Sequence, residues 1–123
     1  ELLKESDYVS LHCPLTSETR HLIDEVHLSM MKPSAAIINT ARGALIDEQA
    51  LIAALQNKRI AKAALDVQEE EPMREDNPLY TMPNVIITPH MGWRGLETRQ
   101  RLLQLVSANI EAYMEGTVIN RVV

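Results

Sequence analysis

Three side chains that could act on a small anionic molecule each follow a short apolar segment of this sequence. Arg42 follows the segment 35–39, Glu71 lies shortly after 61–67, and His90 follows 84–88. Short apolar segments between turn residues are typical of buried strands, and the carboxyl ends of parallel strands form the edge of a sheet where ligands bind. We therefore expect Arg42, Glu71 and His90 to converge at one such edge.

These residue types suit the reduction of a 2-oxo acid. An arginine can hold a carboxylate through two parallel hydrogen bonds. A ketone that accepts a hydride builds up negative charge on its oxygen and needs a proton there. A histidine beside a carboxylate can supply that proton, because the carboxylate favours the imidazolium and fixes the tautomer. Glu70 adjoins Glu71, so the pattern leaves open which of the two is the acid.

The elements that must position these residues alternate between two patterns. Four short apolar segments are expected to form strands buried on both faces: 8–12, 35–39, 61–67 and 84–88. Three segments are expected to form helices: 24–31, which Pro33 closes, 47–57, which Asp47 can cap, and 96–115, which Gly116 ends. The alternation of strand and helix predicts right-handed crossovers, a parallel sheet and an α/β fold.

Composition narrows the classes of partner. The net charge of −5 and the pI of about 5.3 argue against nucleic-acid and acidic-membrane partners, which favour basic surfaces. No apolar segment has the length of a membrane span. Cys13 is the single cysteine, so no internal disulfide can form and a reducing compartment, the cytoplasm, is expected. It has no metal-ligand spacing with the nearby histidines, so we expect no metal site.

The glycines set a limit on what this chain can bind alone. Gly43, Gly92, Gly95 and Gly116 cannot be arranged as a G-x-G-x-x-G loop, which normally cradles the pyrophosphate of a dinucleotide. The first five residues resemble neither a signal peptide nor a usual translation start. We therefore expect a fragment of a longer chain, one that binds a dinucleotide weakly and tends to associate through the exposed edge of its first strand.

Four motifs, in order along essentially all 123 residues, carry a resemblance to a known family. They are Leu11-His12-Cys13-Pro14, Asn39-Thr40-Ala41-Arg42-Gly43, Ala64-Leu65-Asp66-Val67 with Glu71-Pro72, and Thr88-Pro89-His90-Met91-Gly92-Trp93. Together they resemble the D-isomer-specific 2-hydroxyacid dehydrogenases, and most of all the glycerate dehydrogenase (hydroxypyruvate reductase) branch. The resemblance implies the C-terminal half of a Rossmann-type doubly wound parallel sheet, with about four strands and crossover helices.

The resemblance also implies roles for individual residues. Arg42 would orient the substrate, Glu71 would pair with the catalytic histidine, and His90 would donate and accept the proton. Asp66 would face the nicotinamide carboxamide of NAD or NADP. The remaining cofactor contacts would come from Arg42 and His90 themselves and from Cys13, Thr40, Ala41 and Gly92. Trp93 would border the substrate pocket beside Arg42 and His90.

At the level of the whole protein, the resemblance implies a homodimer that reduces a 2-oxo acid of the hydroxypyruvate or glyoxylate type to the D-2-hydroxy acid. Residues 1–116 would form the C-terminal part of its nucleotide-binding domain, and residues 117–123 would return toward a substrate domain. Two alternatives stay open: a relative of the phosphoglycerate, lactate or formate dehydrogenases, and a non-catalytic, corepressor-like binding module on the same fold.

Overall fold

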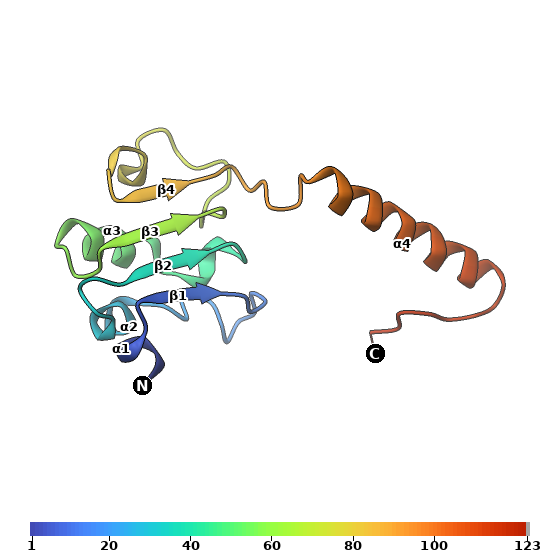
Figure 1. The fold of residues 1–123 in the computed structure, drawn as a ribbon, viewed down its shortest axis with the longest axis horizontal. Coiled ribbons are helices and arrows are strands. Elements are labelled where there is room, and N and C mark those ends of the chain that lie inside the picture. Colours follow the sequence, from blue (N-terminus) through green and yellow to red (C-terminus); the bar gives the residue numbers. More distant parts are fainter. Residues whose placement is uncertain (123) are drawn as a thin grey trace. The chain divides into compact units, whose positions relative to one another are not determined.

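The computed structural model describes residues 1–122, which separate into a larger unit, residues 1–90, and a smaller unit that begins at Met91. The larger unit is built on one parallel sheet with the strand order β1-β2-β3-β4 (Figure 1). Its strands are β1 (Tyr8–Leu11), β2 (Ala36–Asn39), β3 (Lys62–Leu65) and β4 (Val85–Ile87). The four predicted strands and their parallel pairing are therefore confirmed, each a little shorter than its apolar segment.

The helices of the larger unit follow from local capping chemistry. Helix α2 (Glu25–Met30) begins where the Asp24 side chain accepts from the backbone N–H of His27, and α3 (Glu48–Gln56) begins where Asp47 accepts from Ala50. These two helices match the predicted segments. Three short elements were not predicted: α1 (Leu2–Glu5), η1 (Gly43–Leu45) and η2 (Pro78–Thr81).

The expectation that the strands are buried on both faces is wrong for residues 1–90. In β1, Val9 is 6% exposed whereas Tyr8 is 75% exposed, and Ile86 of β4 is 69% exposed. The physical reason lies in the strand order. Each strand is added on the same side of the previous one, so right-handed crossovers place every connection on one face of the sheet. The covered face packs a core of aliphatic side chains from the strands, α2 and α3.

The smaller unit contains the predicted long helix, α4 (Leu96–Met114). Gly116, just past its end, has a φ of 73°, a left-handed conformation that glycine adopts without steric cost. Along residues 1–122, no helix combines the length and apolarity needed to span a membrane. The predicted division into 1–116 and 117–123 stays a prediction, and residue 123 lies outside the described residues.

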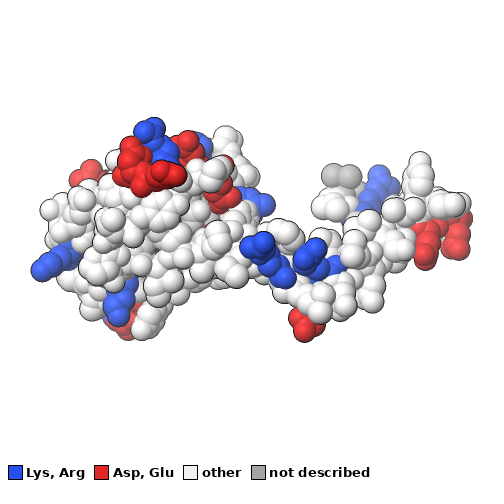
Figure 2. Space-filling model, turned by 90° about the horizontal axis from the view of Figure 1, so that it is seen from above, with Lys and Arg blue, Asp and Glu red and all other residues white. Residues whose placement is uncertain are grey.

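On the face seen in Figure 2, basic and acidic side chains lie interspersed, and much of the surface between them is uncharged.

Candidate active site

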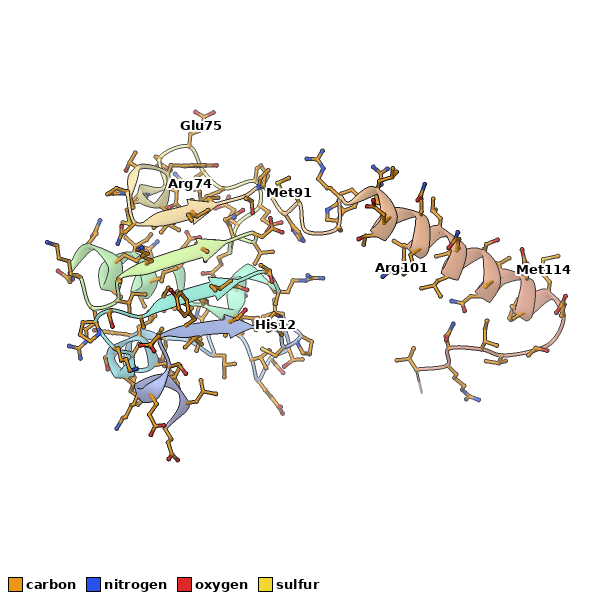
Figure 3. The ribbon with its side chains drawn as sticks, viewed as in Figure 1. His12, Arg74, Glu75, Met91, Arg101 and Met114 are labelled. Carbon is orange, nitrogen blue, oxygen red and sulfur yellow. The ribbon has the colours of Figure 1, made fainter. Side chains whose placement is uncertain are left out.

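The carboxyl ends of the strands bring the predicted catalytic residues of the larger unit to one edge of the sheet. Because the strands are parallel and in register, the loops that follow β2, β3 and β4 leave from the same side. Figure 3 shows His12 just past the end of β1, at this same edge. Arg42 lies in the loop after β2, Glu71 in the loop after β3, and His90 just after β4.

Glu71 and His90 form a direct pair. His90 Nδ1 lies 2.7 Å from Glu71 Oε2, and the backbone N–H of Gln68 donates to Glu71 Oε1 at 3.0 Å. Both oxygens of the carboxylate are thus held, one by the histidine and one by its own loop. Glu70 is exposed and faces the charge of Arg74. The structure therefore places Glu71, not Glu70, against the histidine.

His90 adopts an uncommon backbone conformation. Its φ is 48°, in the left-handed region that costs energy for a residue with a Cβ, and its N–H donates to the carbonyl of Thr88 at 3.0 Å. The tight turn after β4 directs the imidazole back toward Glu71. Strain of this kind is often found at functional sites.

The electrostatics of the pair favour a charged Glu71. Partial burial raises the pKa of its carboxyl, but the hydrogen bonds from His90 and from the Gln68 N–H, with the nearby charges of His90 and Arg42, outweigh that effect. The net pKa lies below the ordinary value of 4.5. The carboxylate is therefore present throughout the neutral range.

This lowered pKa predicts a dependence of stability on pH. A carboxyl group whose pKa is lower in the folded state stabilises the fold above its unfolded pKa, and the contribution is lost as pH falls through the folded value. We expect Glu71 to titrate below 4.5 in a carboxyl-carbon NMR titration of this chain. A pKa at or above that value would show that the pair with His90 does not form in solution.

Asn39 shapes the loop that carries Arg42. This asparagine is 1% exposed; its Nδ2 donates to the carbonyl of Arg42 at 2.9 Å, and its Oδ1 accepts from the N–H of Ala41 at 3.1 Å. The exposed Arg42 guanidinium also donates to the carbonyl of Ala41 at 2.7 Å. Asn39 had no predicted role, although an asparagine that ends a buried strand is a recognisable turn signal.

Gly43 allows the loops after β2 and β3 to touch. A Cβ on this residue would lie 1.9 Å from the backbone carbonyl carbon and oxygen of Gln68 and 2.4 Å from the nitrogen of Glu69. Only a residue without a side chain permits so close an approach of two backbones. Gly43 was predicted only as part of a motif, because its contact with the loop after β3 depends on tertiary structure.

The residues expected to lie along a cofactor occupy neighbouring positions at the same edge. Asp66 is 8% exposed and accepts a hydrogen bond from the hydroxyl of Thr88. Thr40 is exposed, while Cys13 and Ala41 are half-buried against the core. The cofactor contacts themselves stay predictions.

Gly92 and Trp93 belong to the smaller unit, which is described separately. The Trp93 ring is exposed and lies under the Arg99 guanidinium, whose Cζ is 5.7 Å from the ring centroid. The predicted contacts of Gly92 with the cofactor and of Trp93 with the substrate stay predictions.

A hollow of about 470 Å³ lies beside the Glu71–His90 pair. Its wall includes both members of the pair, together with apolar side chains such as Met73, Leu79 and Ile87. It is large enough for a small organic molecule and offers mainly apolar contacts around two polar groups.

The other histidines have structural partners. His27 pairs with Asp24 at 2.7 Å, His21 pairs with Glu69 at 2.8 Å, and Nε2 of His12 lies 2.8 Å from the Ser10 hydroxyl. Within residues 1–122, no group of three or more His, Cys, Asp or Glu residues is arranged to hold a metal ion.

Known proteins resemble this chain in sequence. Residues 1–92 match the sequence model described as the NAD-binding domain of the D-isomer-specific 2-hydroxyacid dehydrogenases. A glyoxylate reductase from Aeropyrum pernix is 48% identical over 96% of this chain and 35% of its own length. A hydroxypyruvate reductase from Blautia hydrogenotrophica is 43% identical over 98% of this chain and 37% of its own.

A solved structure agrees with these sequence matches. The NAD-complexed D-isomer-specific 2-hydroxyacid dehydrogenase of Lactobacillus delbrueckii ssp. bulgaricus superposes with a TM-score of 0.86 at 36% identity, over 96% of this chain and 40% of that one. The chain thus spans about a third of the length of the curated relatives it matches.

Proposed function

The chain belongs to the D-isomer-specific 2-hydroxyacid dehydrogenase family, and we propose that it is the catalytic part of a longer enzyme that reduces a 2-oxo acid to the D-2-hydroxy acid. The observation that carries this proposal is the contact between His90 Nδ1 and Glu71 Oε2. Glyoxylate and hydroxypyruvate are the proposed substrates, because relatives with 48% and 43% identity carry the names of these reductases.

The pair can deliver a proton to the substrate oxygen. A carboxylate only accepts hydrogen bonds, so the hydrogen shared in this contact belongs to His90 Nδ1. Nε2 is then the nitrogen that gives a proton to the carbonyl oxygen of the 2-oxo acid during reduction and takes it back during oxidation. The negative charge of Glu71 stabilises the imidazolium that carries this proton before reduction and after oxidation.

Arg42 is proposed to orient the acid. Its fork can hold the substrate carboxylate through two hydrogen bonds, and its backbone is fixed by the buried Asn39. With the carboxylate held there, the neighbouring carbonyl carbon is the atom to be reduced, and its oxygen can approach His90.

The residues present fit the nicotinamide end of NAD or NADP. The buried Asp66 can accept from an amide N–H, and the exposed Thr40 hydroxyl lies at the same edge of the sheet. The cofactor, when bound, supplies the hydride. No G-x-G-x-x-G loop for its pyrophosphate occurs in the 123 residues. We therefore propose that the remaining cofactor contacts come from other parts of a longer, homodimeric and cytoplasmic protein.

A substrate panel tests this function. The intact protein that carries this chain is assayed with glyoxylate, hydroxypyruvate, pyruvate and 3-phosphohydroxypyruvate, each with NADH and with NADPH. We expect the first two acids to be reduced with the highest kcat/KM and hydroxypyruvate to give D-glycerate. Reduction of none of these acids, or an L-configured product, would contradict the proposal.

Arg42→Lys should weaken substrate use strongly. A lysine keeps the charge but cannot make the two parallel hydrogen bonds of a guanidinium. We expect kcat/KM for hydroxypyruvate to fall by about 10- to 100-fold, the equivalent of a lost charge-assisted hydrogen bond. Steady-state kinetics provide the measurement, and Arg74→Lys, in an exposed pair with Asp76, is the matched control. Equal kinetics for the two variants would exclude a substrate contact by Arg42.

A further inference from the structure

The loop that carries Glu71 holds a second carboxylate, Glu69. Its side chain contacts residues that follow β1, the edge strand opposite β4. Glu71 reaches His90 after β4, whereas Glu69 reaches Arg20 and His21, which follow β1. We propose that Glu69 is a positioning residue, which anchors the loop so that Glu71 meets His90. This inference rests on the proposed function of that pair.

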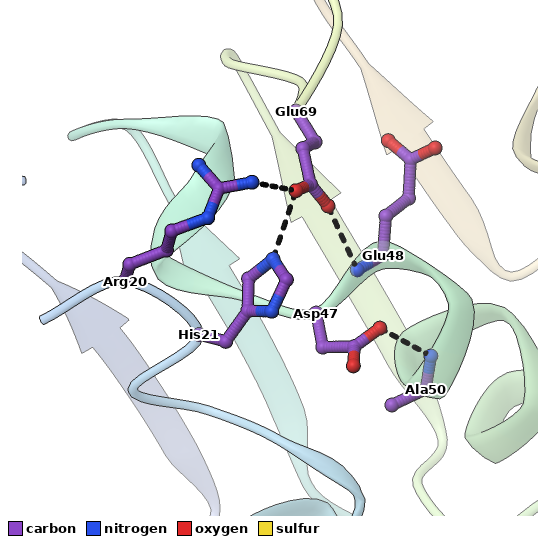
Figure 4. Close-up of polar contacts among 6 residues, drawn as sticks. All are labelled: Arg20, His21, Asp47, Glu48, Ala50 and Glu69. Carbon is purple, nitrogen blue, oxygen red and sulfur yellow. Dashed lines mark hydrogen bonds and ion pairs between the residues drawn. The ribbon is translucent and has the colours of Figure 1, made fainter. Parts of the chain in front are cut away.

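Glu69 makes three contacts with two separate parts of the chain. Its Oε1 lies 2.9 Å from Arg20 Nη2 and 2.8 Å from His21 Nε2, and its Oε2 accepts from the backbone N–H of Glu48 at 3.5 Å (Figure 4). The Glu69 side chain is 26% exposed, and its contact with His21 is partly shielded from water, whereas the Arg20 side chain is 57% exposed. Shielded, charge-assisted contacts are stronger than isolated pairs at the surface.

The groups that Glu69 contacts are themselves fixed. The N–H of His21 donates to the carbonyl of Ala44 at 2.8 Å. Two residues on, the N–H of Ile23 donates to the carbonyl of Leu45 at 3.0 Å. Glu48 begins helix α3, whose capping bond from Ala50 to Asp47 is already made. Glu69 therefore connects its loop to a rigid frame formed by the segments after β1 and β2.

The frame also determines how closely the loop after β3 approaches the loop after β2. Gly43 lies so close to the backbone of Gln68 and Glu69 that no Cβ would fit between them. The N–H of Gln68 in turn donates to Glu71. Gly43 thus packs against the start of the loop, and the Glu69 side chain bonds it to neighbouring segments. Glu71, two residues further on, then contacts His90. A displacement of about 1 Å at such a site is enough to cost roughly 100-fold in rate.

A carboxyl-carbon NMR titration of this chain tests the inference without any activity. Glu69→Gln removes a nearby negative charge, which alone would lower the pKa of Glu71. Loss of positioning has the opposite effect, because it weakens the hydrogen bonds that hold that pKa below 4.5. We expect the pKa of Glu71 to rise in Glu69→Gln. Glu70→Gln, with the same charge change at an exposed neighbour, should leave it unchanged or lower it.

Glu69→Asp is the second variant. It keeps the charge but withdraws the carboxylate by one carbon, so a rise in the pKa of Glu71 is expected there too, and this variant decides the matter if Glu69→Gln does not fold. A pKa of Glu71 that does not rise in the folded variants would overturn the inference.

Kinetics of the intact protein provide an independent readout. We expect Glu69→Gln to lower kcat with hydroxypyruvate by about 10-fold or more while KM changes little, because the acid is held by Arg42 and not by this loop. Glu70→Gln should retain the kcat of the unmodified protein. If the unmodified protein reduces no 2-oxo acid, the proposed function fails, and the NMR titration still decides whether Glu69 positions Glu71.

Discussion

Replacing His90 with alanine in the intact protein is expected to lower turnover with hydroxypyruvate by about 10²- to 10⁴-fold, the usual contribution of a positioned general acid. The variant keeps Arg42 and the other proposed cofactor contacts, so the KM for the acid should change much less than kcat. Stopped-flow measurement of reduced-cofactor oxidation separates this chemical step from product release.

His27 provides a matched control for this substitution. It also pairs through Nδ1 with a carboxylate at 2.7 Å, and its side chain is 40% exposed, as is that of His90. It lies on α2, between β1 and β2. His27→Ala should change turnover by no more than about twofold, as expected of a surface substitution. Equal losses in the two variants would mean that His90 acts through folding and not through proton transfer.

Gly43→Ala is expected to have the largest effect on stability. The new Cβ would lie 1.9 Å from the backbone of Gln68, so two loops must separate. Forced repacking of this kind costs about 1–3 kcal/mol and occasionally more, and here it also moves the loop that holds Glu71. We expect a lower urea midpoint together with a strong loss of turnover in the intact protein.

Gly95→Ala is the corresponding control. A Cβ at this position would lie 3.3 Å from Oγ1 and 3.8 Å from Cβ of Thr98, so only one side chain must move, by a few tenths of an ångström. The cost should stay below about 1 kcal/mol, in the range of an unfavourable N-cap residue. A Gly43→Ala protein as stable and active as Gly95→Ala would show that the loops after β2 and β3 do not touch in solution.

The sequence was sufficient to predict the framework of the fold. Apolar segments between turn residues located all four strands, and Asp47 marked the start of α3 because its side chain satisfies a free N–H group. Burial of the second face was mispredicted. Tyr8 and Ile86 belong to apolar segments, but whether they are covered depends on which connections cross that face, a property of strand order.

The candidate site was predictable in its residue types and less so in its contacts. Arg42, Glu71 and His90 each follow a strand, so the topology of a parallel sheet alone brings them to one edge. The residue pattern alone did not distinguish Glu70 from Glu71, because adjacent side chains in a loop have no periodicity; the choice of Glu71 came from the family resemblance. Glu69 lies 49 positions from Arg20 and 48 positions from His21 along the sequence. No local pattern reveals contacts over such a separation.

The most direct test of proton transfer by the Glu71–His90 pair is the pH dependence of single-turnover rates in both directions. Reduction needs a protonated His90 and oxidation needs a neutral one. In the intact protein, we predict that the rate of hydroxypyruvate reduction falls as pH rises and that the rate of D-glycerate oxidation increases. Both dependences should disappear in His90→Gln. A His90→Gln protein that keeps the opposed pH dependences would contradict the assignment of His90 as the acid and base.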